Sequence, residues 1–325
     1  MRAPDASAFH AGEQAAQTRA GVRDRAERLG PMFRDFLPDQ HRLFFEELPF
    51  LIVGSLDATG SPWASMLRGR PGFAYTPDAQ HLTVRARPMA GDPLAQALAP
   101  DAPLGVLGIQ LHTRRRNRMN GHITALTDDG FTVGVDQSFG NCPQYIAARA
   151  PLDLRAAPRV PTVAEEGSLL GSEARACIEQ ADTCFIASAS SATPDSEDRR
   201  EGVDVSHRGG RAGFVRVREH DGRTVLTLPD FAGNNAFNTL GNLLRLPRAG
   251  MLFPRFDAGT LLLVTGDTEV VFEGPEVATF QGAQRLVHLT VRRGVLLRDA
   301  LPAFGEAVPA REVARTGSWP GRDAP

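Results

Sequence analysis

The pattern of hydrophobic and polar positions changes near residue 48. Between Asp24 and Glu47, apolar residues stand at mixed spacing among good helix formers, with Pro31 and Pro38 between them. Proline interrupts a helix because it lacks a backbone N–H, so we expect one or two short helices here. From Phe50 onwards, short apolar or alternating runs of strand length alternate with turn residues. The sequence therefore predicts a helical N-terminal segment, residues 1–48, followed by a β-rich body.

The first β-rich stretch, residues 49–154, predicts strands on both sides of one helix. Two apolar runs within 50–67 flank the turn sequence D-A-T-G and predict a hairpin. The order expected here is strand–strand–strand–helix–strand–strand–strand. The later strands are expected at 81–87, 104–111, 114–126 and 130–137, and the helix at 91–100.

The second β-rich stretch, residues 171–305, predicts the same order. The motif VSHRGGRAGF at 205–214 repeats MLRGRPGF at 66–73, and the similarity continues collinearly through the helix and the strands after it. Such similarity predicts an internal duplication. Strands are expected at 182–190, 203–217, 223–230, 248–256 and 259–272, with a polar loop at 191–202 and a helix at 234–247.

The remaining segments set the expected domain boundaries. Residues 155–170 begin with a proline-rich polar stretch and are expected to be a linker, and residues 306–325 a C-terminal tail. Several short strands with one helix in each half indicate a small antiparallel barrel per half. We expect a mainly β fold with short helices (α+β), in which two tandem barrels pack as an intramolecular pseudo-dimer.

Composition excludes several classes of protein. The formal net charge of -2 argues against a nucleic-acid or other polyanion partner. No apolar run reaches the length of a membrane span, and the N-terminus lacks the apolar core of a secretory signal. The three cysteines are odd in number and irregularly spaced, which suits a reducing compartment. We therefore expect a cytoplasmic protein without a membrane partner.

Basic chemistry in this chain depends on arginine, because the sequence contains no lysine. A Schiff-base lysine and a Walker-A phosphate lysine are both excluded. A bound phosphate would have to be held by Arg, by Asn, Ser or Thr, or by backbone N–H groups. The histidines stand outside the spacings typical of metal ligands, so no dedicated metal site is expected.

A cluster of amide and hydroxyl residues near a helix start is the first candidate site. Free N–H groups at a helix N-terminus, together with such side chains, can bind an anion. Asparagine also favours ordinary turns and caps, which is the competing interpretation. Because basic residues stand on a neighbouring strand, phosphate binding is supported at least as well as ordinary turn and cap formation. The residues concerned are Asn234, Asn235, Asn238, Thr239 and Asn242, with His207, Arg208 and Arg211 on the neighbouring strand.

The segment TRRRNRMNG at 113–121 is the second candidate. Strand alternation would place Arg114, Arg116 and Arg118 on one face and Arg115 on the other. The arginines could form a solvated edge strand or a cationic wall facing an anionic ligand. Cys142, which precedes a proline, could be a nucleophile or a small packed residue.

These stretches together resemble the pyridoxamine 5'-phosphate oxidase-like family of flavin-binding split β-barrels, and in particular its two-copy bacterial subgroup. The resemblance runs from about the first strand to residue 302. It is carried by GVDVSHRGGRAGFV, by LTLPDFAGNNAFNTLGNLLRLPRAGMLF and by TRRRNRMNG.

The resemblance implies a set of flavin-binding residues. Ser206, His207 and Arg208 would hold the flavin phosphate together with Phe237, Asn238 and Thr239. The family usually has an Arg-Lys pair at the last two positions, so this chain implies a different or weaker grip. The flavin ring would be contacted from the other copy by Arg116, Gln137 and Ser138, which match ring-contacting residues of the family.

The expected function is that of an FMN-dependent oxidoreductase acting on an unknown small molecule. Copy one has Leu94-Ala95 where copy two has the Asn-Thr pair, and copy two has Leu261 where copy one has Arg116. One flavin per chain, between the copies, is therefore expected; FAD would fit the same phosphate residues. Pyridoxamine phosphate oxidation is not expected, because the basic residues for that substrate are missing.

Two further expectations concern partners and the alternative function. A separate reductase could supply the electrons, and the chain could act as a monomeric pseudo-dimer or as a homodimer. The alternative is a non-catalytic protein that binds or senses flavin or haem, for which His207 or Cys142 would be the haem ligand.

Overall fold

The computed structural model describes residues 7–152, 160–193, 196, 198–302 and 304–320. The N-terminal segment is helical as predicted, but its first helix starts before residue 24 and it has more helices than expected. It contains α1 (Ala11–Arg19), α2 (Arg23–Glu27), the 3₁₀ turn η1 (Gly30–Met32) and α3 (Asp39–Glu46). α1 begins at a capping box, in which His10 Nδ1 accepts from the Gly12 N–H and the Glu13 carboxylate accepts from the His10 N–H.

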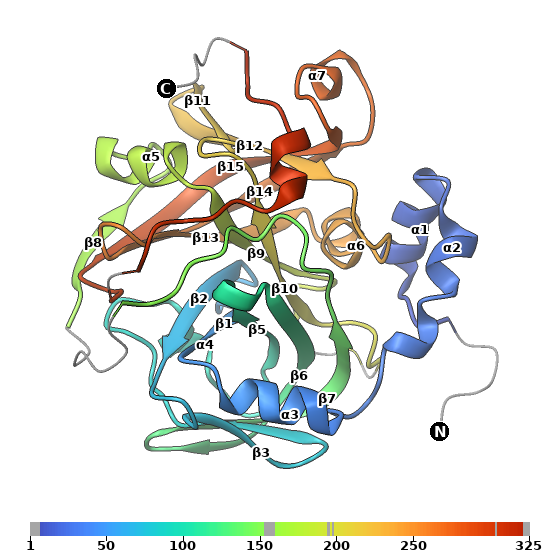
Figure 1. Cartoon of the computed structure of the whole chain (residues 1–325), viewed down its shortest axis with the longest axis vertical. Helices are drawn as coiled ribbons and strands as arrows, with labels where there is room; N and C mark the ends of the chain where they lie inside the picture. The colour runs from blue at the N-terminus through green and yellow to red at the C-terminus, as the bar shows by residue number, and fades with distance from the viewer. Residues whose placement is uncertain (1–6, 153–159, 194–195, 197, 303, 321–325) are drawn as a thin grey trace.

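Two antiparallel sheets form the body (Figure 1). The first contains β1 (Phe50–Leu56), β2 (Pro62–Arg68), β3 (Ala74–Asp78), β4 (His81–Val84), β5 (Pro103–Gln110), β6 (Arg115–Thr127) and β7 (Gly130–Gly140). The second contains β8 (Thr162–Glu166), β9 (Thr183–Ala189), β10 (Val203–Gly209), β11 (Arg216–His220), β12 (Arg223–Phe231), β13 (Arg248–Arg255), β14 (Thr260–Val271) and β15 (Ala283–Arg298). Short helices connect the strands: α4 (Leu94–Ala97), α5 (Ser172–Glu179), α6 (Asn238–Arg245), α7 (Pro275–Ala278), η2 (Leu111–Thr113) and η3 (Arg311–Arg315).

The strand order is the same in the two sheets. It reads β2-β1-β5-β6-β7-β4-β3 in the first and β10-β9-β13-β14-β15-β12-β11 in the second. The orders coincide when β9 is matched to β1, and α4 and α6 then occupy the same place in the chain. The prediction of a mainly antiparallel β protein with a few short helices is confirmed.

The repeated G-R-x-G-F sequence forms the same turn in both halves. Gly72 and Gly213 adopt positive φ angles of 90° and 80°, which glycine reaches at little cost. The phenylalanine that follows each glycine, Phe73 or Phe214, is buried. This turn separates β10 from β11, so the single strand predicted for 203–217 is two strands, and β3 after the first turn was missed.

Parts of the expected linker and of the expected C-terminal tail pack on the second half of the protein. Residues 155–159 and 321–325, which belong to these predictions, lie outside the described residues. Beyond the first gap, β8 pairs with β15 and adds a strand to the second sheet. In the C-terminal segment, the Trp319 indole N–H donates to the Phe214 carbonyl at 2.8 Å, so this part is anchored to the second half.

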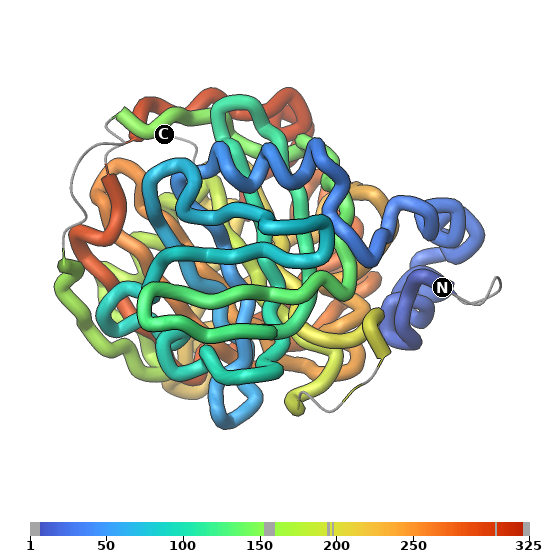
Figure 2. The backbone as a smooth tube through the Cα atoms, turned by 90° about the horizontal axis from the view of Figure 1, so that it is seen from below, coloured from blue at the N-terminus to red at the C-terminus, as the bar shows by residue number. Residues whose placement is uncertain are grey.

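The two halves pack against each other through a shared apolar cluster. Trp63 and Ile52 of the first half and Phe185 and Leu263 of the second are fully buried in it. Figure 2 shows the body from below, with α1 and α2 projecting at one side. None of the described helices has both the length and the apolar composition needed to span a bilayer.

Candidate functional site

An open cleft lies between the halves, where β10 and the start of α6 face β6 and the segment after β7. About 900 Å³ of empty space lies within it, including the solvent-open space at its mouth. The second half contributes one wall with Ser206, His207 and Arg208 and another with the loop that leads into α6. The first half contributes Arg116 and Arg118 and the residues between Asn141 and Tyr145.

Most of the site residues expected from the sequence meet in this cleft. They are Arg116, Ser206, His207, Arg208, Asn234, Asn235, Asn238 and Thr239. Three others contact the N-terminal segment or its neighbourhood instead. The Asn242 amide bonds His10 and Ser188, Gln137 donates to the Ala8 carbonyl, and Ser138 donates to the Phe36 carbonyl.

Arg116 brings a positive charge to the cleft. Among the described residues, no carboxylate forms an ion pair with it. Its Nε donates to the Cys142 carbonyl at 2.7 Å. Burial lowers the pKa of the guanidinium below its usual range, and the charges of Arg118 and Arg208 act in the same direction, but the group stays protonated at neutral pH. A half-buried cation held beside two other cations favours an anionic ligand.

The expected arginine face is only partly formed. β6 begins at Arg115, and Arg114 lies before it in a left-handed conformation with φ of 58°. Arg114 therefore leaves the strand alternation and donates to the Ile146 and Val308 carbonyls. Arg116 and Arg118 do share the cleft face, and Arg115 lies exposed on the other side.

Arg118 is the buried centre of a polar network across the two halves. Its Nη1 donates to both Asp204 oxygens at 2.8 and 2.9 Å, and its Nη2 donates to Ser206 Oγ at 2.5 Å. Asn120 donates to Asp204 Oδ1 at 3.3 Å. Both members of the ion pair are almost fully buried, so each depends on the other for compensation of its charge.

His207 is a buried imidazole whose two nitrogens have no hydrogen-bond partner among the described residues. Its ring meets Phe185 edge-on with centroids 5.6 Å apart. Burial lowers the pKa of His207 well below its usual value, and the nearby charges of Arg116 and Arg208 act in the same direction. The imidazole is therefore neutral, and it offers one donor and one acceptor to a ligand.

The start of α6 has the features of an anion site. Phe237, the residue before the helix, has a φ of 62°, and no side chain in the described part of the chain caps the free N–H groups of the first turn. Thr239 in that turn is buried, and its hydroxyl has no partner among the described residues. The Asn141 Oδ1 across the cleft is also buried, and no described residue donates a hydrogen bond to it.

The segment after β7 closes one side of the cleft. Tyr145 has a φ of 63° and stacks on Phe231 with ring centroids 5.1 Å apart. Its hydroxyl donates to the Ala232 carbonyl at 3.2 Å. Residues of the first half thereby contact the loop of the second half that leads to α6. The sequence singled out only Cys142 in this segment, and nothing in the pattern indicated that the segment crosses to the other half.

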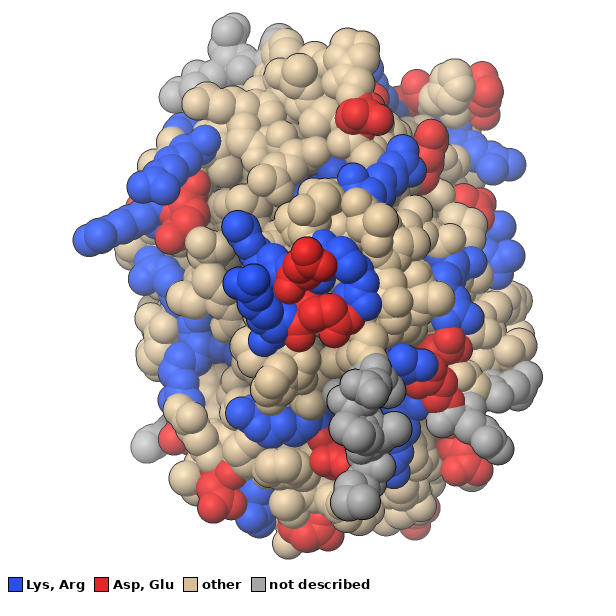
Figure 3. All heavy atoms as spheres, turned by 90° about the vertical axis from the view of Figure 1, so that its right-hand side faces the viewer, with Lys and Arg blue, Asp and Glu red and all other residues tan. Residues whose placement is uncertain are grey.

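Figure 3 shows the face of the molecule that carries α1 and α2. Acidic side chains gather near the middle of this face, and basic side chains surround them. Because the chain has no lysine, the basic groups are arginines. This face therefore lacks the continuous basic surface that is typical of polyanion-binding proteins.

No family model and no curated protein matches the chain. Solved structures give weak similarities. HupZ of Group A Streptococcus aligns over 42% of this chain and 99% of its own, at 11% identity and a TM-score of 0.30. The inhibitor of motility MotI/DgrA of Bacillus subtilis aligns over 75% and 87%, at 9% identity and a TM-score of 0.20. MrkH of K. pneumonia, solved in complex with c-di-GMP, aligns over 80% and 87%, at 7% identity and a TM-score of 0.23. At these scores the similarities carry no argument about function.

Proposed function

We propose that the chain is a two-copy split-barrel flavoprotein related to the pyridoxamine 5'-phosphate oxidase-like family. It would bind one FMN in the cleft between its halves and act as an oxidoreductase on a small molecule. The single observation that carries this proposal is the arrangement at the start of α6. There, uncapped N–H groups and the unpartnered Thr239 hydroxyl face a cleft that also contains Arg116.

The donor set fits the phosphate end of a flavin nucleotide. Helix N–H groups, a hydroxyl and a guanidinium are all phosphate ligands, so the chain can do without the Arg-Lys pair. Asn238 and Thr239 would bind the phosphate from α6, with Ser206 and Arg208 beside them on β10. Arg208 is only loosely paired, since its Nη2 lies 3.8 Å from Asp230 Oδ1.

The first half would contact the other end of the flavin. Arg116, Cys142 and Tyr145 line the cleft from that side. The flavin itself would supply hydride or single-electron transfer, and the protein would set its orientation and solvent access. Neutral His207 can accept or donate a hydrogen bond inside the cleft but carries no charge there.

A comparison of the halves supports one site per chain. Arg116 is the second residue of β6, and the second residue of β14 is Leu261. His207 is the fifth residue of β10, and the fifth residue of β2 is Met66. Leu261 and Met66 lie buried in the apolar cluster between the halves, so the corresponding region is filled. A duplication followed by loss of one site accounts for this difference.

The alternative function, haem binding, rests on His207 alone. An unpartnered neutral imidazole in a cleft is a suitable iron ligand. The flavin proposal is preferred because haem binding at His207 would leave the N–H groups and the Thr239 hydroxyl at the start of α6 without a role. A separate reductase remains the proposed electron donor, and the proposed cellular location is the cytoplasm.

The visible absorption spectrum of the purified protein, followed by chromatography of whatever heat releases, tests these proposals. A flavin spectrum with one FMN per chain supports the site between the halves. A Soret band would favour haem. Two tightly bound flavins per chain would contradict the single site. A colourless protein that does not bind added FMN would contradict the flavoprotein proposal.

Replacing Arg116 with glutamine should weaken FMN binding about tenfold, because a charged hydrogen-bond donor toward the flavin ring is lost from a half-buried position. The matched control is Arg115→Gln on the exposed face of the same strand. Fluorescence titration with FMN measures both variants. Equal affinities for the two variants would remove Arg116 from the site.

A further inference from the structure

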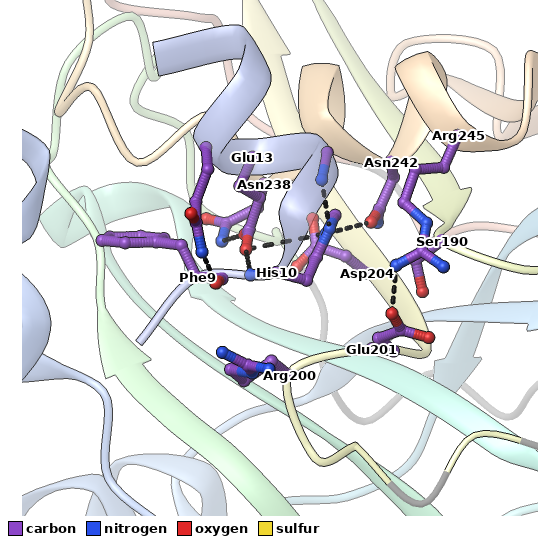
Figure 4. Close-up of polar contacts among 12 residues, drawn as sticks. Phe9, His10, Glu13, Ser190, Arg200, Glu201, Asp204, Asn238, Asn242 and Arg245 are labelled. Carbon is purple, nitrogen blue, oxygen red and sulfur yellow. Dashed lines mark hydrogen bonds and ion pairs between the residues drawn. The ribbon is translucent and has the colours of Figure 1, made fainter. Parts of the chain in front are cut away.

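Helix α1 lies against α6 beside the cleft (Figure 4). The two helices touch at glycines: a Cβ on Gly12 would lie 2.2 Å from the Gly241 carbonyl oxygen, and one on Gly241 would lie 2.5 Å from Glu13 Cα. This close approach brings the side chains of α1 to the first turn of α6. That turn is the proposed phosphate site.

Glu13 is the acidic residue that this contact places there. Its side chain is almost fully buried. One carboxylate oxygen accepts from the His10 N–H at 2.8 Å, and the other accepts from the Asn238 amide. Asn238 is the first residue of α6 and also lines the cleft. The Glu13 carboxyl is therefore separated from the cleft by one side chain.

Several charged groups face Glu13 from the neighbouring elements. Asp204 of β10 and Arg118 of β6 act on it in opposite directions, and Arg200 also interacts with it. Arg245 of α6 lies against Gly12 and pairs with Glu201, while Asp198 pairs with Arg200. His10 is neutral, because burial lowers its pKa to about 4.

The charge of Glu13 changes within an accessible pH range. Burial raises the pKa of Glu13 to about 8, which the hydrogen bonds from His10 and Asn238 partly oppose. Below that pH the carboxyl is protonated and uncharged. Above it, a negative charge stands beside the N-terminal end of α6, where a phosphate dianion would bind.

We propose that Glu13 couples anion binding in the cleft to proton uptake, so that a phosphate-bearing ligand binds when Glu13 is protonated and is opposed when Glu13 is ionised. This inference rests on the proposed function for the identity of the ligand, but not for the anion site itself. By linkage, a bound anion raises the proton affinity of Glu13 as much as the proton raises anion affinity.

The test is calorimetric titration of the full chain with FMN, riboflavin and inorganic phosphate at pH 7 and pH 9. A phosphate monoester is already a dianion across this range, and riboflavin carries the same ring without the phosphate. We expect FMN to bind roughly fivefold more weakly at pH 9 than at pH 7, beyond any change seen with riboflavin. Glu13→Gln, which keeps an acceptor oxygen, should abolish this difference. Asp24→Asn, on an exposed residue of α2, should retain it.

A second measurement does not depend on a variant. Titration of the unmodified protein near pH 8 in two buffers of different ionisation enthalpy should show proton uptake with FMN and none with riboflavin. Absence of that uptake, or a Glu13→Gln protein with unchanged pH dependence, would overturn the coupling. If inorganic phosphate binds with proton uptake and FMN does not bind, the flavin proposal fails and the coupling holds. If neither ligand binds, both fail.

Discussion

Replacing Asp204 with alanine should lower the free energy of unfolding by about 3–5 kcal/mol, the cost typical of breaking a buried ion pair. Its carboxylate accepts two hydrogen bonds from Arg118 and a third from Asn120, and both charged side chains are almost fully buried. The variant would leave the Arg118 guanidinium charged in a low-dielectric environment. Urea denaturation followed by circular dichroism measures the change.

The double variant Arg118→Leu, Asp204→Leu is the control for this prediction. The corresponding strand positions of the other half are Leu263 and Trp63, which are buried without charge. An apolar pair is therefore compatible with this architecture, and the double variant should recover most of the loss. A single variant that loses less than about 1 kcal/mol, or a double variant less stable than the single one, would contradict this account.

Apolar runs and apolar alternation predicted most of the fold, because the strands concerned have one or both faces buried. β1 and β9 are apolar runs and are buried almost throughout. β8 was missed because its sequence TVAEE is mostly exposed and has no apolar period. It becomes a strand only by pairing with β15, a contact that local sequence does not encode.

The residues of the proposed phosphate site stand in short stretches whose meeting at the cleft was predictable from the sequence. Its residues occur in two short stretches, one on β10 and one around the start of α6, and each stretch has a composition that indicates its chemistry. The role of α1 was not predictable in this way. Glu13 and Asn238 are separated by 225 positions along the chain, and His10 is an unusual helix cap.

The placement of Gln137 and Ser138 also follows from the packing of the N-terminal segment on the body. Both residues hydrogen-bond to carbonyls of the N-terminal segment, those of Ala8 and Phe36, rather than facing the cleft. Phe33 of that segment packs on Phe139 with ring centroids 4.5 Å apart. The N-terminal segment thus spans from the last strand of the first sheet to α6 of the second half, and it supports the loop that holds the proposed phosphate site.

Replacing Gly250 with alanine should lower the free energy of unfolding by about 3 kcal/mol, at the upper end of the usual cost of overpacking. A Cβ at this position of β13 would lie 2.4 Å from the Pro62 carbonyl oxygen and 2.5 Å from Trp63 Cα. Both atoms belong to the backbone of β2 in the other half, so no side-chain rotation relieves the overlap. Thermal and urea unfolding of the variant measure the loss.

The contact of Gly250 with β2 has a counterpart elsewhere in the interface between the halves, which gives the prediction a second test. Gly105 of β5 meets the backbone of β10 in the same manner, where a Cβ would lie 2.9 Å from Asp204 Cα. Gly105→Ala should therefore destabilise the protein too, but less, because the overlap is smaller. Gly167→Ala, at a position with no atom within 4 Å of an added Cβ, should change stability by less than about 0.5 kcal/mol. If Gly250→Ala were as stable as Gly167→Ala, β2 and β13 could not be packed backbone to backbone. The two halves would then lack the close contact that brings Arg116 and Arg118 of one half to His207 of the other.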